Sequence, residues 1–184
     1  FKNNIETDYS CVLGDFGLSK IKHDEKVNYR CNIQTIWYRS PEIFFKIPFN
    51  ESIDMWSYGI LFYELLFNIN LIRTKKDEDL LLNIVYLLDV PDEKYILSDY
   101  RILNYFSSYK NKWVLNKNTT HDNKIMLPNA SKKLKIDAIF NLNKYNYHIC
   151  KIILFIVRKC LNYDSKLRYT PNELLNFINI NFKK

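Results

Sequence analysis

Hydrophobic residues recur with a helical period in three stretches of the chain. Residues 77–88 start with three acids and then place four apolar side chains on one helical face, Leu81, Ile84, Val85 and Leu88. Residues 149–161 repeat this pattern, with basic residues on the opposite face. The sequence from Thr170 to Glu173 combines a capping box with proline at the first helical position. These patterns predict two amphipathic helices and a last helix that ends at about residue 180.

A fourth stretch, residues 52–67, is apolar on nearly all sides. We expect it to form the buried central helix of the molecule. Ser52 is the expected cap, and Asp54 lies in the first turn, where the helix dipole favours an acid. Pro41 predicts the start of a short helix before it.

The remaining segments lack a sustained period. Residues 9–13 form a short apolar run that predicts one strand, ending in a tight turn at Gly14. Residues 15–40 predict a long ordered loop, a kind that is usually functional. Residues 98–147 are rich in Asn, Lys, Tyr and Ser, and we expect an insertion with little regular structure. The predicted fold class is mainly α.

Composition indicates a folded chain and narrows the kind of partner. The 184 residues favour one domain, and 47% hydrophobic with 16% aromatic residues exclude a disordered chain. The net charge of +7 is uneven: residues 1–97 hold 11 basic and 15 acidic side chains, residues 98–147 hold 9 and 3, and residues 148–184 hold 7 and 2. The basic residues follow no single helical face, so a solvated surface is favoured and nucleic acid is an unlikely partner.

Four further features are disfavoured, namely a disulfide framework, a zinc site, a membrane span and a secretory signal. The four cysteines contain no C-x-x-C pair, so we expect free thiols in an intracellular compartment, cytoplasm or nucleus. His148 and Cys150 lack a second ligand pair at zinc spacing. The apolar stretch 53–72 carries two acids and two asparagines, which argues against a membrane span. No secretory signal opens the chain, which begins with Phe1.

The candidate chemistry begins with Asp15-Phe16-Gly17, directly after the predicted strand. A carboxylate beside a flexible glycine suits Mg²⁺, which prefers hard oxygen donors and also accepts phosphate oxygens. Alone, this three-residue motif is weak evidence and favours a simple turn. Three further motifs follow: Thr-Ile-Trp-Tyr-Arg-Ser-Pro-Glu at 35–42, Ser-Ile-Asp-Met-Trp-Ser-Tyr-Gly at 52–59, and a late arginine, Arg168.

In order and spacing, these four elements resemble the C-terminal half of a eukaryotic protein kinase domain, over essentially the whole chain. The forms of residues 33–42 and 87–93 are similar to the CMGC group, which contains cyclin-dependent, dual-specificity tyrosine-regulated and SR-protein kinases. The resemblance implies the large C-terminal lobe only, of a fold that is α+β when complete. It also implies one domain at 1–184, with an activation segment at 15–42, a central helix at about 52–67 and a group-specific insertion at about 98–147.

The resemblance assigns roles at the expected nucleotide and acceptor sites. Asp15, with Phe16 and Gly17, would form part of the ATP site, with Asp15 as the Mg²⁺ ligand and Phe16 packed beneath it. Thr35 would line the substrate channel, where its hydroxyl meets the catalytic base. Arg39 would bind the backbone or a phosphorylated side chain of the activation segment, and its alternative is a surface ion pair.

Two structural roles are implied as well. Glu42 and Arg168 would form a partly buried ion pair that fixes the end of the activation segment, and Asp54 would accept hydrogen bonds from the catalytic-loop backbone. Tyr29 is the only hydroxyl between Ser19 and Thr35, so phosphorylation-dependent activation uses Tyr29, is absent, or is replaced by a built-in charge.

The favoured function is a serine/threonine protein kinase that uses ATP and Mg²⁺, acts on protein substrates and has a possible regulatory subunit. The sequence contains no His-Arg-Asp loop and no Gly-rich loop, so we expect the 184 residues alone to be inactive. The alternative is a pseudokinase or truncated kinase-like module that binds proteins without catalysis.

Overall fold

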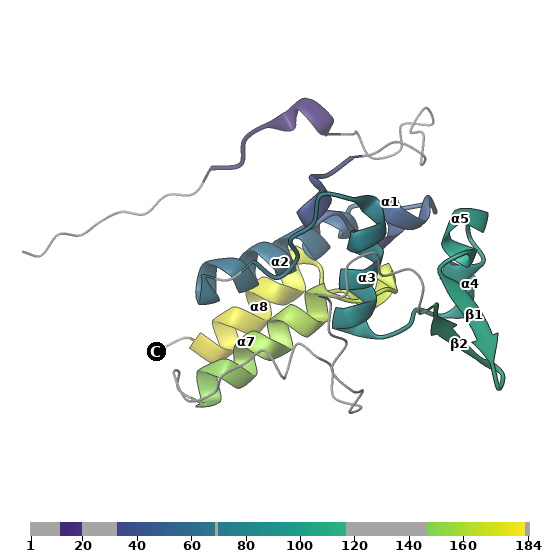
Figure 1. Cartoon of the computed structure of the whole chain (residues 1–184). Coiled ribbons are helices and arrows are strands. Elements are labelled where there is room, and N and C mark those ends of the chain that lie inside the picture. The colour runs from purple at the N-terminus through teal and green to yellow at the C-terminus, as the bar shows by residue number, and fades with distance from the viewer. Residues whose placement is uncertain (1–11, 20–32, 69, 117–146, 183–184) are drawn as a thin grey trace, which may run out of the picture.

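The computed structural model describes residues 12–19, 33–68, 70–116 and 147–182. Within these ranges helices dominate and the only sheet is a two-stranded antiparallel hairpin, so the predicted mainly α class is confirmed (Figure 1). The helices are α1 (Pro41–Phe45), α2 (Ser52–Phe67), α3 (Asp77–Leu88), α4 (Glu93–Ile96), α5 (Tyr100–Leu103), α7 (Tyr147–Cys160) and α8 (Pro171–Phe182). The strands are β1 (Phe106–Tyr109) and β2 (Lys112–Leu115), and three short 3-10 helices span Phe16–Leu18, Ile36–Tyr38 and Ser165–Leu167.

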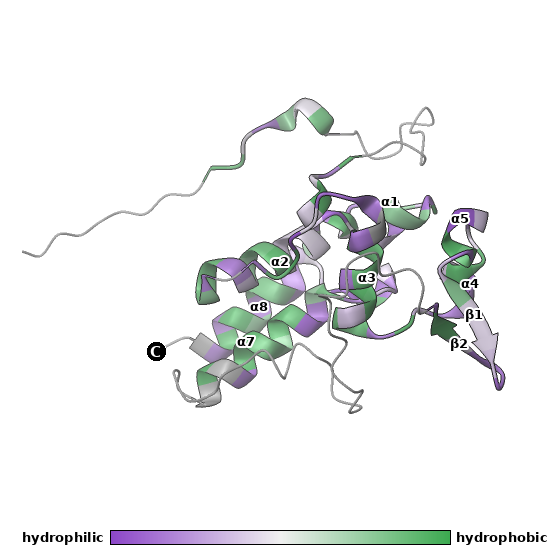
Figure 2. Ribbon diagram, in the orientation of Figure 1, coloured by the Kyte–Doolittle hydropathy of each residue, from purple (hydrophilic) through white to green (hydrophobic). Residues whose placement is uncertain are grey.

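Helix α2 lies at the centre of the main core cluster, but it is not buried on all sides as we expected, because Leu61, Leu65 and Leu66 are exposed. Its side chains Trp56, Ile60 and Tyr63 are almost completely buried, in a cluster that also takes residues from α3 and α7. Figure 2 shows hydrophobic residues, in green, along α2 and α7 where the two helices run past each other. Because a fully buried large side chain contributes about 1.5–3 kcal/mol, this cluster is a main source of the fold's stability.

The contact between α2 and α7 depends on Gly59. A Cβ atom at this position would lie 2.5 Å from the Cβ of Cys160 and 3.2 Å from Leu161 Cδ2. Real Cβ atoms do not approach so closely, so any side chain at position 59 would push the helices apart. The glycine therefore sets the distance between α2 and α7, and Cys160 is fully buried at the contact.

Helix α3 joins two hydrophobic clusters, which is more than the single predicted face. Its Leu80 and Ile84 pack into the cluster around α2, whereas Leu81 and Val85 pack into a second cluster beside the insertion. The second cluster contains Phe45 of α1, Tyr95 and Ile96 of α4, and Ile102 and Phe106 of the insertion. The insertion is thus packed against the helix that ends the predicted activation segment.

The first part of the insertion has more regular structure than we expected. Residues 98–116 hold α5 and the β1–β2 hairpin, and residues 117–146 lie outside the described ranges. The hairpin turns at Lys110 and Asn111, whose φ angles are 50° and 58°, as a two-residue turn between twisted strands requires. Phe106 and Leu115 pair across the ladder and face the second cluster.

Two expectations at element ends are wrong. The strand expected at residues 9–13 is not present at Val12 and Leu13, and the rest of it lies outside the described ranges. These two residues have no neighbouring strand in the described part of the chain, and a strand needs one for its backbone hydrogen bonds. Ser52 is the first helical residue of α2 rather than its cap, because Asn50 Oδ1 accepts hydrogen bonds from both the backbone N and the Oγ of Ser52.

The capping box at the start of α8 is confirmed. Glu173 Oε2 accepts hydrogen bonds from Thr170 N at 2.8 Å and from Thr170 Oγ1 at 2.9 Å, and Thr170 Oγ1 accepts one from Glu173 N. These backbone and side-chain hydrogen bonds lower the pKa of Glu173. None of the helices in the described ranges is both long enough and apolar enough to cross a membrane.

Candidate functional site

Residues 33–40, which contain Thr35 and which we call the acceptor segment, are fastened to α2 through Gln34. The Nε2 of Gln34 donates hydrogen bonds to Ile53 O at 3.0 Å and to Ser57 Oγ at 2.9 Å. Its Oε1 accepts one from Ser40 N at 2.9 Å, so one amide spans the whole turn. The backbone at Gln34 is left-handed, with φ at 65°, a conformation that a residue with a Cβ adopts only when its surroundings hold it.

The adjoining 3-10 helix is held by a second set of contacts. Trp37 Nε1 donates a hydrogen bond to Thr74 O in the loop between α2 and α3. Tyr38 OH donates one to Glu64 Oε2 at 2.8 Å, and the other carboxylate oxygen, Oε1, accepts one from Leu71 N. The hydrogen bond to Glu64 raises the pKa of Tyr38, which keeps this phenol protonated as a donor.

Thr35 lies between these anchors and is exposed. Its carbonyl accepts a hydrogen bond from Tyr38 N at 2.9 Å, which closes the 3-10 turn. Within the described residues its hydroxyl makes no hydrogen bond, so the hydroxyl is open to a partner from outside. The segment therefore presents a threonine hydroxyl on a backbone that is fixed on both sides.

Arg39 makes contacts of both predicted kinds. Its Nη2 donates a hydrogen bond to Gln34 O at 3.3 Å, which is backbone of the activation segment. Its Nη1 forms an ion pair with Asp77 Oδ1 at 3.0 Å, at the start of α3. The Arg39 side chain is only 11% exposed, and its Nε is buried without an acceptor among the described residues.

The structure brings Glu42 and Arg168 together as a buried ion pair. Arg168 Nη2 donates a hydrogen bond to Glu42 Oε2 at 2.7 Å, and Arg168 Nη1 lies 2.7 Å from Glu42 Oε1. The side chain of Arg168 is 0% exposed and that of Glu42 is 3% exposed. The guanidinium also donates to Asn162 O and Ser52 O and lies over the ring of Trp56. The pair therefore ties α1, α2 and the segment before α8 at one point.

Asp54 lies in the first turn of α2, as predicted. Partial burial raises the pKa of its carboxyl, although the residue remains open to solvent on one side. No hydrogen bond to this carboxylate is found within the residues that the structure covers. Its expected partner, the backbone of a catalytic loop, has no counterpart in the described ranges.

Asp15, Phe16 and Gly17 are not brought to Thr35. Residues 12–19 stand apart from the helical body, and all eight are exposed (Figure 1). Phe16 is 66% exposed, so it does not pack beneath Asp15 as we expected. The physical reason is that no apolar surface of the described helical body reaches this segment, whose 3-10 turn is closed by its own Ser19 N to Phe16 O hydrogen bond.

Asp15 offers a single carboxylate to a metal ion. The described residues contain no group of three His, Cys, Asp or Glu side chains that would hold a metal ion by themselves. Mg²⁺ bound together with a nucleotide usually takes one or two carboxylates, with phosphate and water oxygens in its other positions. A single exposed carboxylate at Asp15 fits that arrangement.

Two residues of the site were missed in the sequence. Gln34 and Glu64 each connect several parts of the acceptor segment. Glu64 could have been found from the sequence, because an acid among the apolar residues of a helix indicates that it has a polar partner. Gln34 carried no comparable signal, because its role depends on a left-handed backbone.

Comparison with known proteins agrees with this geometry. The family that matches residues 3–178 is described as the protein kinase domain. The chain is 29% identical over 177 residues to a dual specificity tyrosine-phosphorylation-regulated kinase 3 homolog of Drosophila melanogaster. This alignment covers 88% of the chain and 20% of the Drosophila protein.

Two other relatives fit the same picture. The chain is 29% identical to human dual specificity tyrosine-phosphorylation-regulated kinase 4, over 88% of the chain and 28% of that protein. It is 36% identical to cyclin-dependent kinase C-1 of Arabidopsis thaliana, over 49% of the chain and 18% of that protein. The chain thus spans less than a third of the length of these relatives. The chain belongs to the protein kinase domain family, in the CMGC group that contains these dual-specificity and cyclin-dependent kinases.

Proposed function

We propose that this chain is the substrate-binding part of a serine/threonine protein kinase that transfers a phosphoryl group from ATP to protein hydroxyls. The observation that carries the proposal is the acceptor segment, residues 33–40, which Gln34, Tyr38 and Arg39 hold against α2 and α3. Such pre-ordering fixes a peptide acceptor without a further ordering cost, which is how binding energy promotes phosphoryl transfer. The exposed hydroxyl of Thr35 supports serine/threonine direction.

Asp15 is proposed as the magnesium ligand at the nucleotide site, with Phe16 and Gly17 beside it. Bound Mg²⁺ would neutralise the charge on the nucleotide's phosphates. The contribution of the chain itself is to supply one carboxylate to the ion and to orient the acceptor peptide. For this role the segment 12–19 must approach Thr35, so we expect it to adopt another position when nucleotide is bound.

The proposal extends to partners and to the isolated chain. The 184 residues contain neither a His-Arg-Asp loop nor a Gly-rich loop, so we expect them alone to transfer no phosphoryl group. The names of the cyclin-dependent relatives suggest a regulatory subunit for this protein too. The free, buried thiol of Cys160 is in keeping with an intracellular compartment.

A direct test of Asp15 uses the protein expressed with the reading frame that precedes Phe1. We expect Asp15→Ala to lower phosphorylation of a protein substrate at least 100-fold, because one metal-binding carboxylate is lost. The matched control is Asp92→Ala, which removes an exposed acid beside the insertion. Equal phosphate incorporation by wild type and Asp15→Ala would contradict the metal assignment.

The alternative function is a kinase-like module that binds proteins without catalysis. The observation in its favour is that the helical body closes its core without residues 12–19. Reading the codons upstream of Phe1 separates the two. A Gly-rich loop, a strand lysine and a His-Arg-Asp loop there would support the enzyme, and degenerate motifs would support the module.

A further inference from the structure

Three cations lie together in the loop between α2 and α3. Arg73, Lys75 and Lys76 are all exposed. Among the described residues, the ion pairs of the chain do not include any of the three. We call these three residues the basic ridge.

The loop backbone directs the basic ridge outward. Ile72 is 0% exposed and Thr74 is 5% exposed, so these alternate residues face the body, and Arg73 and Lys75 between and after them face solvent. Thr74 Oγ1 donates a hydrogen bond to Lys76 O at 2.9 Å and accepts one from Lys76 N at 3.2 Å. The turn that carries the cations is therefore fixed by its own hydrogen bonds.

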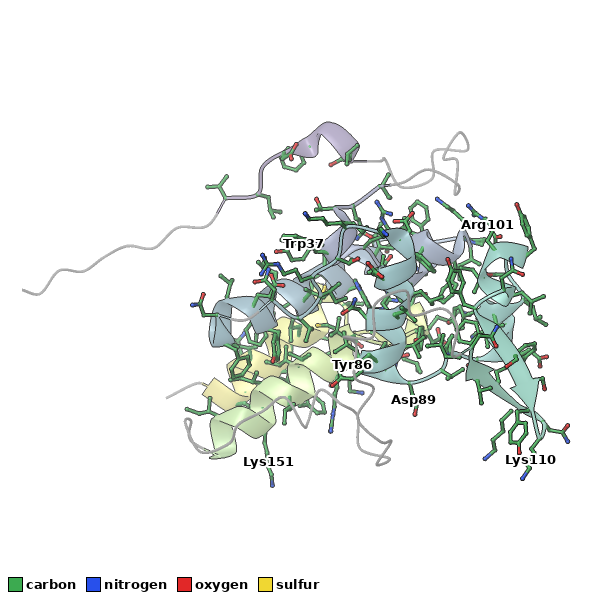
Figure 3. The ribbon with its side chains drawn as sticks, in the orientation of Figure 1. Trp37, Tyr86, Asp89, Arg101, Lys110 and Lys151 are labelled. Atoms are coloured by element: carbon green, nitrogen blue, oxygen red, sulfur yellow. The ribbon has the colours of Figure 1, made fainter. Side chains whose placement is uncertain are left out.

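The basic ridge adjoins the acceptor segment. Trp37 Nε1 donates its hydrogen bond to Thr74 O, in the middle of the ridge. Thr35 is two residues from Trp37, a distance of at most about 7 Å along the backbone. Figure 3 shows Trp37 at the edge of the body, and Figure 1 shows the α2–α3 loop running along the same side.

Two acids near the ridge are engaged by other groups. Asp77, which follows the ridge, pairs with Arg39 at 3.0 Å. Glu64 accepts hydrogen bonds from Tyr38 and from Leu71 N through its two oxygens. Asp77 and Glu64 are therefore not the partners of the ridge, whose cations face the side of the molecule that carries the acceptor segment.

We propose that the basic ridge selects peptide substrates that carry carboxylate or phosphate groups next to the acceptor hydroxyl. This inference rests on the proposed function, because it takes residues 33–40 as the place where the peptide binds. Exposed charges at the rim of a site act mainly through long-range attraction and specificity. The preference must therefore weaken as salt shortens the screening length from about 10 Å at 0.1 M to about 3 Å at 1 M.

The first experiment measures peptide binding to the 184-residue chain by fluorescence anisotropy, without nucleotide. Four labelled 12-residue peptides share one central serine and differ in the flanking residues, which are alanine, aspartate, phosphoserine or arginine. We expect the aspartate and phosphoserine peptides to bind about 10-fold more tightly than the alanine peptide at low salt, and the arginine peptide more weakly. Tight binding by phosphoserine alone would identify phosphate as the ligand, and equal binding by all four would overturn the inference.

The second experiment assigns the preference to the ridge. The double variant Lys75→Glu/Lys76→Glu should bring the aspartate peptide to the affinity of the alanine peptide. The matched control is Lys110→Glu/Lys112→Glu, which makes the same charge change on the hairpin, far from Trp37 (Figure 3). An equal loss of affinity for the aspartate peptide in both double variants would overturn the inference. The inference would also fail if a 12-residue RNA bound as tightly as the acidic peptide and lost affinity in the ridge variant.

This design separates the inference from the function on which it rests. Selective binding of acidic peptides that needs Lys75 and Lys76 stands even if no phosphoryl transfer is found. If the protein expressed with its upstream frame phosphorylates all peptides with equal kcat/KM, the function stands and the inference fails.

Discussion

The acceptor segment, residues 33–40, lies within the predicted activation segment, and residues 12–19, which we call the metal segment, overlap its start at Asp15. The two segments differ in how they are held. The acceptor segment makes side-chain hydrogen bonds to α2 and to the loop after it, and it ends at a buried ion pair. The metal segment has eight exposed residues, among them Val12 and Leu13 at 90% and 85% exposure. Order in this region therefore comes from contact with the helical body.

The difference separates two kinds of site chemistry. Thr35, Arg39 and Glu42 have their positions set by the described residues themselves. Among the described residues, only the short 3-10 turn that follows Asp15 fixes its position. Peptide positioning can therefore be tested in this chain directly, whereas metal binding depends on what brings the segment 12–19 toward Thr35.

The largest effect is expected from breaking the ion pair that ends the acceptor segment. Arg168→Ala leaves Glu42 buried and unpaired, and should lower the free energy of unfolding by about 3–5 kcal/mol. Urea denaturation followed by circular dichroism measures it. Lys94→Ala is the control, because its pair with Asp164 is exposed and 3.8 Å long, and it should leave the free energy of unfolding close to that of the wild type. A similar loss in both variants would show that burial of the pair does not matter.

A smaller effect is expected at Gln34. Gln34→Ala removes three hydrogen bonds to α2 and Ser40 but keeps a Cβ at a φ of 65°, and should cost about 2 kcal/mol. Gln34→Gly loses the same hydrogen bonds but relieves the left-handed strain, so it should cost about 1 kcal/mol less. Both are measured by urea denaturation with Thr35→Ala as an exposed neighbouring control. If glycine costs as much as alanine, the backbone at Gln34 is not strained.

The smallest effect is expected in the metal segment. Phe16→Ser replaces a side chain that is 66% exposed, and should change the free energy of unfolding by less than about 0.5 kcal/mol. Phe45→Ser is the contrasting variant, since Phe45 is fully buried and truncation of such a ring costs about 3–5 kcal/mol. Thermal and urea unfolding of both variants provide the measurement. A large loss for Phe16→Ser would mean that residues 12–19 pack on the body in solution.

The long helices were predictable because each has a period or cap that is visible along the chain, whereas the one-turn helices α4 and α5 were not predicted. The bounds 52–67 and 77–88 match α2 and α3, and the Thr170–Glu173 box begins α8. The hairpin was missed because its left-handed turn is made by Lys110 and Asn111, without the glycine that usually marks such turns. The absent strand at Val12 and Leu13 shows the converse, since an apolar run forms a strand only where a partner is available.

The candidate site was predictable in its motif residues and not in its connections. The contact between Glu42 and Arg168, which are 126 residues apart in the sequence, was expected from the resemblance to protein kinases. The contacts of Gln34 with Ile53 and of Trp37 with Thr74 join segments whose proximity exists only in the folded molecule. Local pattern carries no information on such pairs, so the basic ridge became visible only once the loop was placed beside Trp37.

The tight passage of α2 over α7 at Gly59 has a practical consequence for Cys160. Burial raises the pKa of this thiol to about 12, so almost none of it is the reactive thiolate at neutral pH. Cys160 is therefore shielded from alkylating reagents for as long as the two helices stay in contact. The rate at which an alkylating reagent labels Cys160, measured by mass spectrometry, therefore reports how often the helical core opens.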